Sequence, residues 1–130
     1  MHIVDGLFVG ATYSTQVWIS EAAWKAVEKH TKHEGRLRFL EKVEHYAEAG
    51  FGVFEGNRAP IRHEGGGVYR VANKTTSLFR LIGFYETGRD SFIIVDAFKK
   101  KGQKLSASER NRIAKVAKVK KDRTWRRRQA

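Results

Sequence analysis

Three apolar runs near the middle of the chain constrain its fold more than any other feature. They span residues 68–72, 78–85 and 92–98, and they contain the β-branched and aromatic residues that are typical of strands. The separators between them are short and polar, and the second contains Gly88, which favours consecutive hairpins. The sequence therefore predicts a three-stranded antiparallel meander.

Helical patterns stand on both sides of these runs. Apolar residues at helical spacing predict two amphipathic helices, which pair as a hairpin. The first begins at Ser14 or Ser20 and has Ile19 and His30 on its apolar face, and the second covers 37–47. Ser106, with Glu109 three residues later, has the spacing of a capping box and predicts the start of a third helix. Helices therefore flank the predicted sheet in sequence.

The remaining segments complete the expected fold. Residues 3–9 predict a short strand, and residues 50–67 have the glycine, asparagine and proline content of a connecting loop. The third helix is basic apart from a narrow apolar stripe at Ile113, Val116 and Ala117. The expected class is α+β, with two N-terminal helices packed on a small antiparallel sheet of three or four strands and a basic C-terminal helix.

Length and composition set the domain organisation and exclude several kinds of site. A chain of 130 residues with 41% hydrophobic residues predicts a single domain over 1–121, followed by a basic tail at 122–130. The absence of cysteine excludes disulfides and thiolate metal sites, and His30 and His33 have no evident third ligand nearby, so we expect no metal or cofactor. Because no apolar run is long enough to span a bilayer, we also expect an intracellular protein that does not bind membranes.

The excess positive charge is confined to the C-terminal part. Residues 1–98 hold 12 basic and 12 acidic residues, whereas residues 99–130 hold 14 basic and 2 acidic residues. A neutral body with a strongly basic end is typical of a protein that binds a polyanion, most often a nucleic acid.

Two arginines interrupt the predicted strands. Arg70 and Arg80 lie within apolar runs, where a purely structural strand favours uncharged residues, and three lysines at 99–101 follow the last run. If the strands pair as a meander, these cations converge on one side of the sheet. Such a cluster would bind phosphate and stabilise charge that develops on it.

The same segments carry a resemblance to a known family. The motifs are G-V-Y-R-V at 67–71, F-R-L-I-G-F-Y at 79–85 and I-I-V-D-A-F-K-K-K-G-Q-K at 93–104. With two helices before them and a basic helix after them, they resemble the RelE/ParE superfamily of bacterial type II toxins, and in particular its HigB-like, phage-associated branch. The resemblance covers about residues 35–120 in the order of elements.

The resemblance implies a toxin that acts in the bacterial cytoplasm. It would be a metal-independent, ribosome-dependent endoribonuclease that cleaves mRNA to inhibit translation, and an antitoxin protein would silence it. The residues that then correspond to the catalytic site are Arg70, Arg80, Lys99, Lys100 and Lys101, with His63 and Asp96 as candidates for proton transfer. The expected RNA-binding residues are Lys74, Tyr85, Gln103, Lys104, Arg110 and Arg112.

The sequence leaves alternatives open for the roles of two residues and for the function of the protein. Asp96 could be a structural partner of Arg70 or Arg80, and His63 could be an ordinary surface histidine. The chain also lacks the tyrosine that RelE has shortly beyond its last strand. A ParE-like toxin that acts on DNA gyrase without cutting RNA, and a non-catalytic nucleic-acid-binding module, are the two alternative functions.

Overall fold

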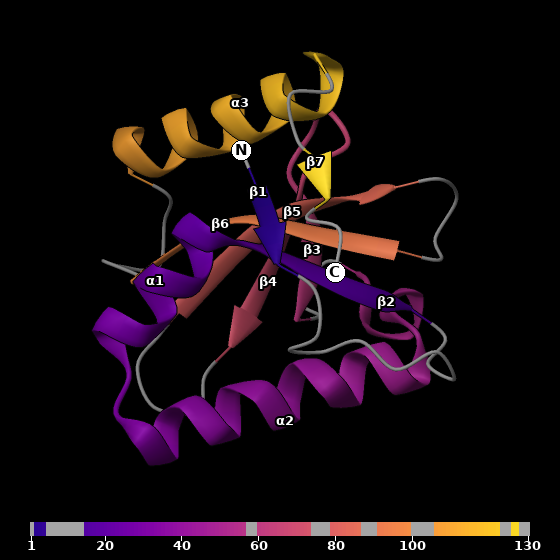
Figure 1. The fold of residues 1–130 in the computed structure, drawn as a ribbon. Helices are drawn as coiled ribbons and strands as arrows, with labels where there is room; N and C mark the ends of the chain where they lie inside the picture. Colours follow the sequence, from indigo (N-terminus) through magenta and orange to yellow (C-terminus); the bar gives the residue numbers. More distant parts are fainter. Residues whose placement is uncertain are drawn as a thin grey trace.

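A mixed β-sheet with helices on both faces organises the computed structural model, which describes residues 2–4, 15–56, 60–73, 79–86, 91–99, 106–122 and 126–127 (Figure 1). Over these residues the sheet has seven strands in the order β3-β4-β5-β6-β2-β1-β7. The strands are β1 (His2–Val4), β2 (Gln16–Ser20), β3 (Ile61–His63), β4 (Tyr69–Asn73), β5 (Phe79–Glu86), β6 (Ser91–Lys99) and β7 (Arg126–Arg127). The helices are α1 (Glu21–His30), α2 (His33–Ala49), the short 3-10 helix η1 (Phe51–Phe54) and α3 (Ala107–Asp122).

The predicted meander forms the middle of this sheet. Strands β4, β5 and β6 pair antiparallel in sequence order, which confirms the hairpin prediction. The prediction of an antiparallel sheet with three or four strands was wrong, because β2 pairs parallel with β6 and β1 pairs parallel with β7. The sheet is therefore mixed and extends well beyond the meander.

The N-terminal boundary of the first helix accounts for part of this difference. Of the two predicted starts, Ser20 is correct and Ser14 is wrong, because Ile19 lies in β2, where Val17, Trp18 and Ile19 are all buried. The helix begins after Ser20, whose Oγ accepts a hydrogen bond from the N–H of Ala23 at 3.0 Å. A continuous apolar run buried on both sides has no alternation, so its pattern does not distinguish a strand from a helix.

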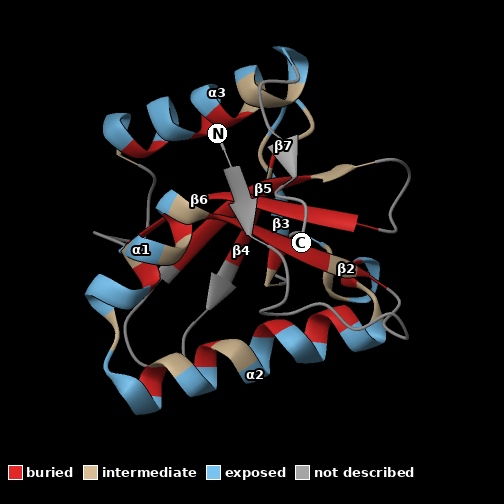
Figure 2. Ribbon diagram, viewed as in Figure 1, coloured by how far each residue is buried: buried red, intermediate tan, exposed pale blue. Residues whose placement is uncertain are grey.

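The two faces of the sheet are covered by different helices. Figure 2 shows α1 and α2 on one side of the buried strands and α3 on the other, each with its exposed face outward. The cluster on the α1 and α2 side includes Val27, Phe39, Val43, Phe92 and Ile94. The cluster on the α3 side includes Ile82, Phe84, Ile93, Ile113 and Val116. The predicted packing of the N-terminal helices on the sheet and the apolar stripe of the third helix are thus confirmed.

A β-bulge in β6 fixes the direction of its side chains. Ile82 pairs with Asp96 and Gly83 pairs with Ile94, so Val95 is the additional residue. A Cβ atom on Gly83 would meet the backbone oxygen of Ile93, so this position needs glycine. The bulge places Asp96 on the face of the sheet that α3 covers.

Two segments differ from the expected loop and tail. The segment predicted as a loop contains η1 and the edge strand β3, which has only three residues. The predicted tail contributes β7 at the opposite edge of the sheet. Among the described helices, none is both long and apolar enough to cross a membrane.

Candidate functional site

The two predicted arginines lie on the same face of the sheet, beneath α3. Arg70 pairs in register with Ile82, and Arg80 lies two residues before Ile82 on β5. Arg70 is 8% exposed and Arg80 is 4% exposed. Buried charges need partners, because their removal from water is costly. Each of these two arginines has a carboxylate partner.

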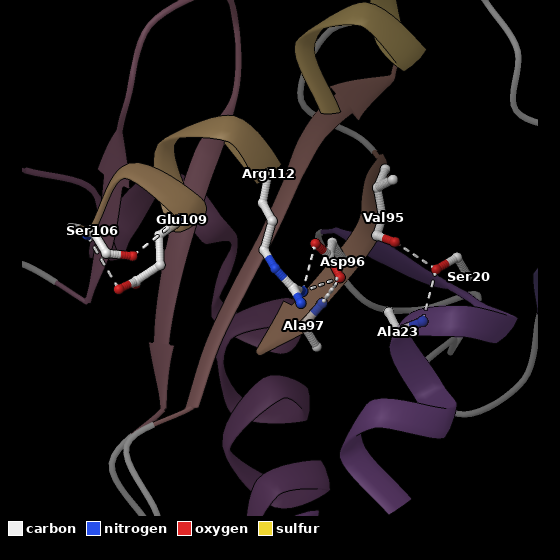
Figure 3. Close-up of polar contacts among 8 residues, drawn as sticks. All are labelled: Ser20, Ala23, Val95, Asp96, Ala97, Ser106, Glu109 and Arg112. Atoms are coloured by element: carbon white, nitrogen blue, oxygen red, sulfur yellow. Dashed lines mark hydrogen bonds and ion pairs between the residues drawn. The ribbon is translucent and has the colours of Figure 1, made fainter. Parts of the chain in front are cut away.

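Arg80 connects the sheet to α3. Its Nη1 donates to Oε2 of Glu109 at 2.7 Å, and both side chains are 5% exposed. The other oxygen of Glu109 accepts from the N–H of Ser106 at 3.3 Å, and the N–H of Glu109 donates to Ser106 Oγ at 3.1 Å (Figure 3). The predicted capping box is therefore present, and Glu109 also serves as the counter-ion of Arg80.

Asp96 is also turned toward α3. Nη1 of Arg112 donates to Oδ1 and Oδ2 of Asp96 at 3.1 and 3.0 Å, and Asp96 Oδ1 accepts from the N–H of Ala97 (Figure 3). The guanidinium carbon of Arg112 lies 5.1 Å from the ring centroid of Phe98. Asp96 thus has a structural partner, and this partner is an arginine of α3.

The other predicted site residues from the basic segments divide into two groups. Lys99 and Arg110 are exposed, on β6 and α3 respectively. The predicted residues that lie outside the described part of the chain are Lys74, Lys100, Lys101, Gln103 and Lys104. The expected convergence of the lysines at 99–101 with the two arginines therefore stays a prediction.

A hollow of about 470 Å³ opens at the β3 edge of the sheet. It extends across both faces of this edge, since His63 pairs with Tyr69 and Arg62 pairs with Arg70, and neighbouring residues of a strand point to opposite faces. Its lining residues are Glu55, Gly56, Arg62, His63, Glu64, Tyr69 and Arg70. Imidazole, carboxylate, phenol and guanidinium groups are therefore gathered in one hollow.

The cationic side of this hollow is built around Arg70. Its Nε lies 3.1 Å from Oε1 of Glu64, and their side chains are 10% and 18% exposed. Burial lowers the pKa of Arg70, an effect that Glu64 opposes and the nearby guanidinium groups of Arg80 and Arg62 increase. Arg62 itself is exposed. The hollow thus has one buried guanidinium in its wall and one accessible guanidinium.

Aromatic rings form the other side. The exposed ring of His63 lies 4.9 Å from that of Tyr69, and Tyr69 meets Tyr85 edge to face at 5.1 Å. The hydroxyl of Tyr85 donates to Oε1 of Glu55 at 3.0 Å. Tyr85 is half-buried. It lies behind the hollow and contacts both Tyr69 and Glu55.

A second hollow, of about 720 Å³, lies between the β3–β4 turn and the last turns of α3. Gly66 contributes from the turn, and Nζ of Lys120 occupies the space that a Cβ atom on Gly67 would take. Lys115 and Lys118 are both exposed on the same helix. The outer surface of α3 is thus strongly basic, as its sequence predicts.

The structure separates the predicted catalytic residues into two places. Arg80 and Asp96 lie beneath α3 in ion pairs, whereas His63 and Arg70 line the hollow at β3. Sequence reasoning missed Glu55, Arg62 and Glu64 as members of this hollow. Their only sequence signal is proximity to His63, because a three-residue edge strand is too short to show a periodic pattern.

Comparison with known proteins adds no assignment. A scan against models of protein families found no match to this chain, and a search of curated proteins found no significant relative. Over the described residues, no group of three or more histidine, aspartate or glutamate side chains is placed to hold a metal ion.

Proposed function

We propose that this protein is a ribosome-dependent endoribonuclease of the RelE/ParE type, from the HigB-like branch, that cleaves mRNA and so inhibits translation. The observation that carries the proposal is the hollow at β3, which combines His63 with two guanidinium groups and two carboxylates. The motifs at 67–71, 79–85 and 93–104 support it independently of the geometry.

The chemistry of RNA cleavage matches these groups. A 2′-hydroxyl that attacks the adjacent phosphate must lose a proton, and the leaving 5′-oxygen must gain one. His63 is exposed at the hollow and is the side chain best suited to proton transfer there. Arg62 and Arg70 would neutralise the phosphorane, a role in which fixed guanidinium groups are effective. None of these steps requires a metal ion.

The proposal gives a different role to Arg80 and Asp96. Both are held by residues of α3, at the distances given above, so they act as anchors for that helix. Arg70 belongs to both groups, because it is buried beneath α3 and also lines the hollow. Substitution of Arg80 would therefore test stability and activity together, which makes His63 the better probe of catalysis.

The test uses the full chain in a cell-free translation reaction, in which mRNA 5′ ends are mapped by primer extension beside naked mRNA. We expect new ends that require ribosomes, that persist in His33→Ala and that fall at least about a hundredfold in His63→Ala, since a general acid or base contributes roughly 10²–10⁴-fold. His33 is a matched control because it is exposed in the first turn of α2.

Two results would contradict the proposal. Intact mRNA with normal translation would exclude the nuclease activity altogether. Equal cleavage by His63→Ala and the unmodified chain would retain the activity but remove it from the hollow at β3.

The proposed activity has two further requirements. The protein would work in the bacterial cytoplasm, where it meets ribosomes and mRNA, and a cognate antitoxin protein would keep it inactive until needed. Co-expression with the gene that adjoins it should suppress growth arrest if that gene encodes the antitoxin.

The cations of α3 favour a second candidate, a nucleic-acid-binding module without catalysis. Lys115, Lys118 and Arg110 can contact phosphates regardless of sequence. This alternative predicts salt-dependent binding to naked RNA with no cleavage and no dependence on ribosomes. The primer-extension experiment therefore separates the two candidates.

A further inference from the structure

The hollow between the β3–β4 turn and the end of α3 gathers three lysines. Its volume of about 720 Å³ lies within the range of small-molecule sites. Lys118, Lys120 and Lys121 line it from α3, and Gly66 lines it from the turn. Asp122 also lines the hollow, so its three positive and one negative side chains give it a net charge of +2. None of these residues lines the hollow at β3.

The glycines of the turn let α3 and one of these lysines come close. Gly66 and Gly67 have positive φ angles of 62° and 76°, which residues with a side chain rarely adopt. A Cβ atom on Gly66 would lie 3.3 Å from the Cβ atom of Ala117, and Nζ of Lys120 occupies the position of a Cβ atom on Gly67. The half-buried side chain of Lys120 therefore lies against the turn, which gives its ammonium group a defined place at the hollow.

Helix geometry explains part of this charge but not its arrangement. Cations are favoured in the last turn of a helix by the helix dipole, which accounts for Lys120 and Lys121. Within the described part of the chain, no ion pair joins Lys118, Lys120 or Lys121 to an acidic side chain. Because like charges repel one another, an anion in this hollow would be stabilised by all three lysines.

A compact polyphosphate matches this arrangement better than the backbone of RNA does. The three lysines lie within four consecutive residues, which corresponds to a rise of about 4.5 Å along a helix. Neighbouring phosphates of a triphosphate share a bridging oxygen, so their charges are similarly close together, whereas a ribose separates the singly charged phosphates of RNA. Ammonium groups are compact charges with three donors each, which suits them to phosphate oxygens.

We propose that the hollow lined by Gly66, Lys118, Lys120 and Lys121 binds a compact polyphosphate, the chemistry of a nucleotide triphosphate group. Two kinds of molecule carry this group, a free nucleoside triphosphate and an RNA with a 5′-triphosphate end. The site goes beyond the proposed nuclease, because it takes its ligand at residues that the cleavage chemistry does not use.

Isothermal titration of the full chain with inorganic tripolyphosphate tests the site without ribosomes or mRNA. At fixed ionic strength we expect one saturable site, with an affinity at least about tenfold above that for inorganic phosphate. Lys120→Gln should lower the affinity for tripolyphosphate about tenfold, the loss expected for one charge-assisted hydrogen bond.

Two further variants separate the geometry of the site from the net charge of the protein. Lys115→Gln makes the same charge change at an exposed position of α3 that does not line the hollow, and should change the affinity by less than about twofold, since salt screens distant charges. Gly67→Ala keeps every charge but places a Cβ atom where Nζ of Lys120 lies, so it should weaken binding. Circular dichroism checks that all three variants keep the fold.

Matched ligands identify the source of the phosphates. A nucleoside triphosphate is compared with its monophosphate, and an RNA with a 5′-triphosphate is compared with the same RNA carrying a 5′-monophosphate. Tighter binding of either triphosphate supports the site and names its ligand. Equal affinities for phosphate and tripolyphosphate, or equal losses in Lys115→Gln and Lys120→Gln, would overturn the site, because net charge alone would then explain the binding.

Discussion

At the scale of single residues, Glu109 connects the start of α3 to strand β5 through one carboxylate. It caps the start of α3, and it neutralises Arg80 on β5. The side chains of Arg80 and Glu109 are both almost inaccessible to solvent, so water cannot replace either partner if the other is removed. A buried ion pair often gives no more stability than apolar residues of the same volume would. We therefore expect this pair to determine mainly the position of α3 on the sheet.

The first prediction concerns this pair. Glu109→Ala leaves Arg80 buried without this counter-ion and removes the cap, so the free energy of unfolding should fall by about 3–5 kcal/mol. Urea denaturation measures the loss, with Glu48→Ala as the exposed control. Asp96→Asn should cost less than about 1 kcal/mol, because the Arg112–Asp96 pair is partly exposed. Similar losses in Glu109→Ala and Asp96→Asn would contradict this ranking.

The second prediction concerns Tyr46, which is 2% exposed between α2 and the core. Burial raises the pKa of Tyr46 above its ordinary value. Below pH of about 10 the tyrosine is protonated in both states, but at higher pH only the unfolded chain ionises readily. Stability should therefore fall as the pH rises above about 10, through the raised pKa of the folded state.

Tyr46→Phe removes this contribution. Urea denaturation between about pH 9 and pH 11 should show a shallower loss of stability in the variant than in the unmodified chain. Parallel pH profiles for the two proteins would show that the phenol of Tyr46 does not contribute.

At the scale of elements, the pairing of β5 with β6 shows how one irregularity directs several contacts. The bulge at Val95 leaves Ile93 and Phe98 packed beneath α3 and turns Asp96 toward Arg112. The carbonyl oxygen of Val95 accepts from Ser20 Oγ at 2.7 Å, which joins the start of α1 to the same point of β6 (Figure 3). Helices on both faces are therefore attached at one bulge.

The third prediction tests the close approach that this bulge requires. Gly83→Ala brings a Cβ atom against the backbone of Ile93, and backbone cannot rotate away as a side chain can. The free energy of unfolding should fall by about 1–3 kcal/mol, as in other overpacked cores. Gly65→Ala is not a neutral control, because Gly65 has a positive φ of 95°.

At the scale of the whole molecule, the excess positive charge lies on one side of the sheet. The basic residues of α3 lie on one outer layer, whereas α2 on the opposite layer carries acidic and basic residues together (Figure 1). A polyanion should therefore approach the α3 side. Glu64 lines the hollow at β3 and Gly66 lines the hollow at the end of α3, so one short turn contributes to both hollows.

The fourth prediction follows from this asymmetry. Lys115→Gln and Lys118→Gln should each reduce the slope of log K against log salt by about 0.7 for single-stranded RNA. Fluorescence anisotropy at several salt concentrations measures the slopes, and Lys25→Gln on α1 should leave the slope unchanged. A loss of the same size in Lys25→Gln would show that net charge, and not the α3 surface, governs binding.

Local signals made much of the fold predictable. The meander, the helix over 37–47 and the Ser106–Glu109 cap each depend on residues close in sequence, and the structure confirms them. Strand β2 depends on pairing with β6, a distant segment, so no local pattern could identify it. The α+β class was therefore correct, whereas the number of strands and their all-antiparallel pairing were not.

The site was less predictable for a related reason. Arg70 and Arg80 stand out because they interrupt apolar runs, yet that pattern is shared by phosphate ligands and by buried ion pairs. The carboxylates of Glu64 and Glu109 decide between the two roles, because they pair with Arg70 and Arg80. Only the packing of α3 and of the β3–β4 turn brings these carboxylates close to the arginines. The hollow at β3 joins segments on both sides of an edge strand, a contact that composition does not reveal.

The pairing of β1 with β7 has a consequence for how the protein is made. Register partners His2 and Arg126 lie far apart in the sequence, and β2 needs β6, which is synthesised much later. Strands β1 and β2 can pair with each other early, but their remaining edges stay unpaired until β6 and β7 have been made. Pairings this distant in sequence slow folding. The sheet can be completed only once Arg126 and Arg127 have left the ribosome, so we expect the unpaired edge of β1 to be open to proteases and to wrong strand partners until then.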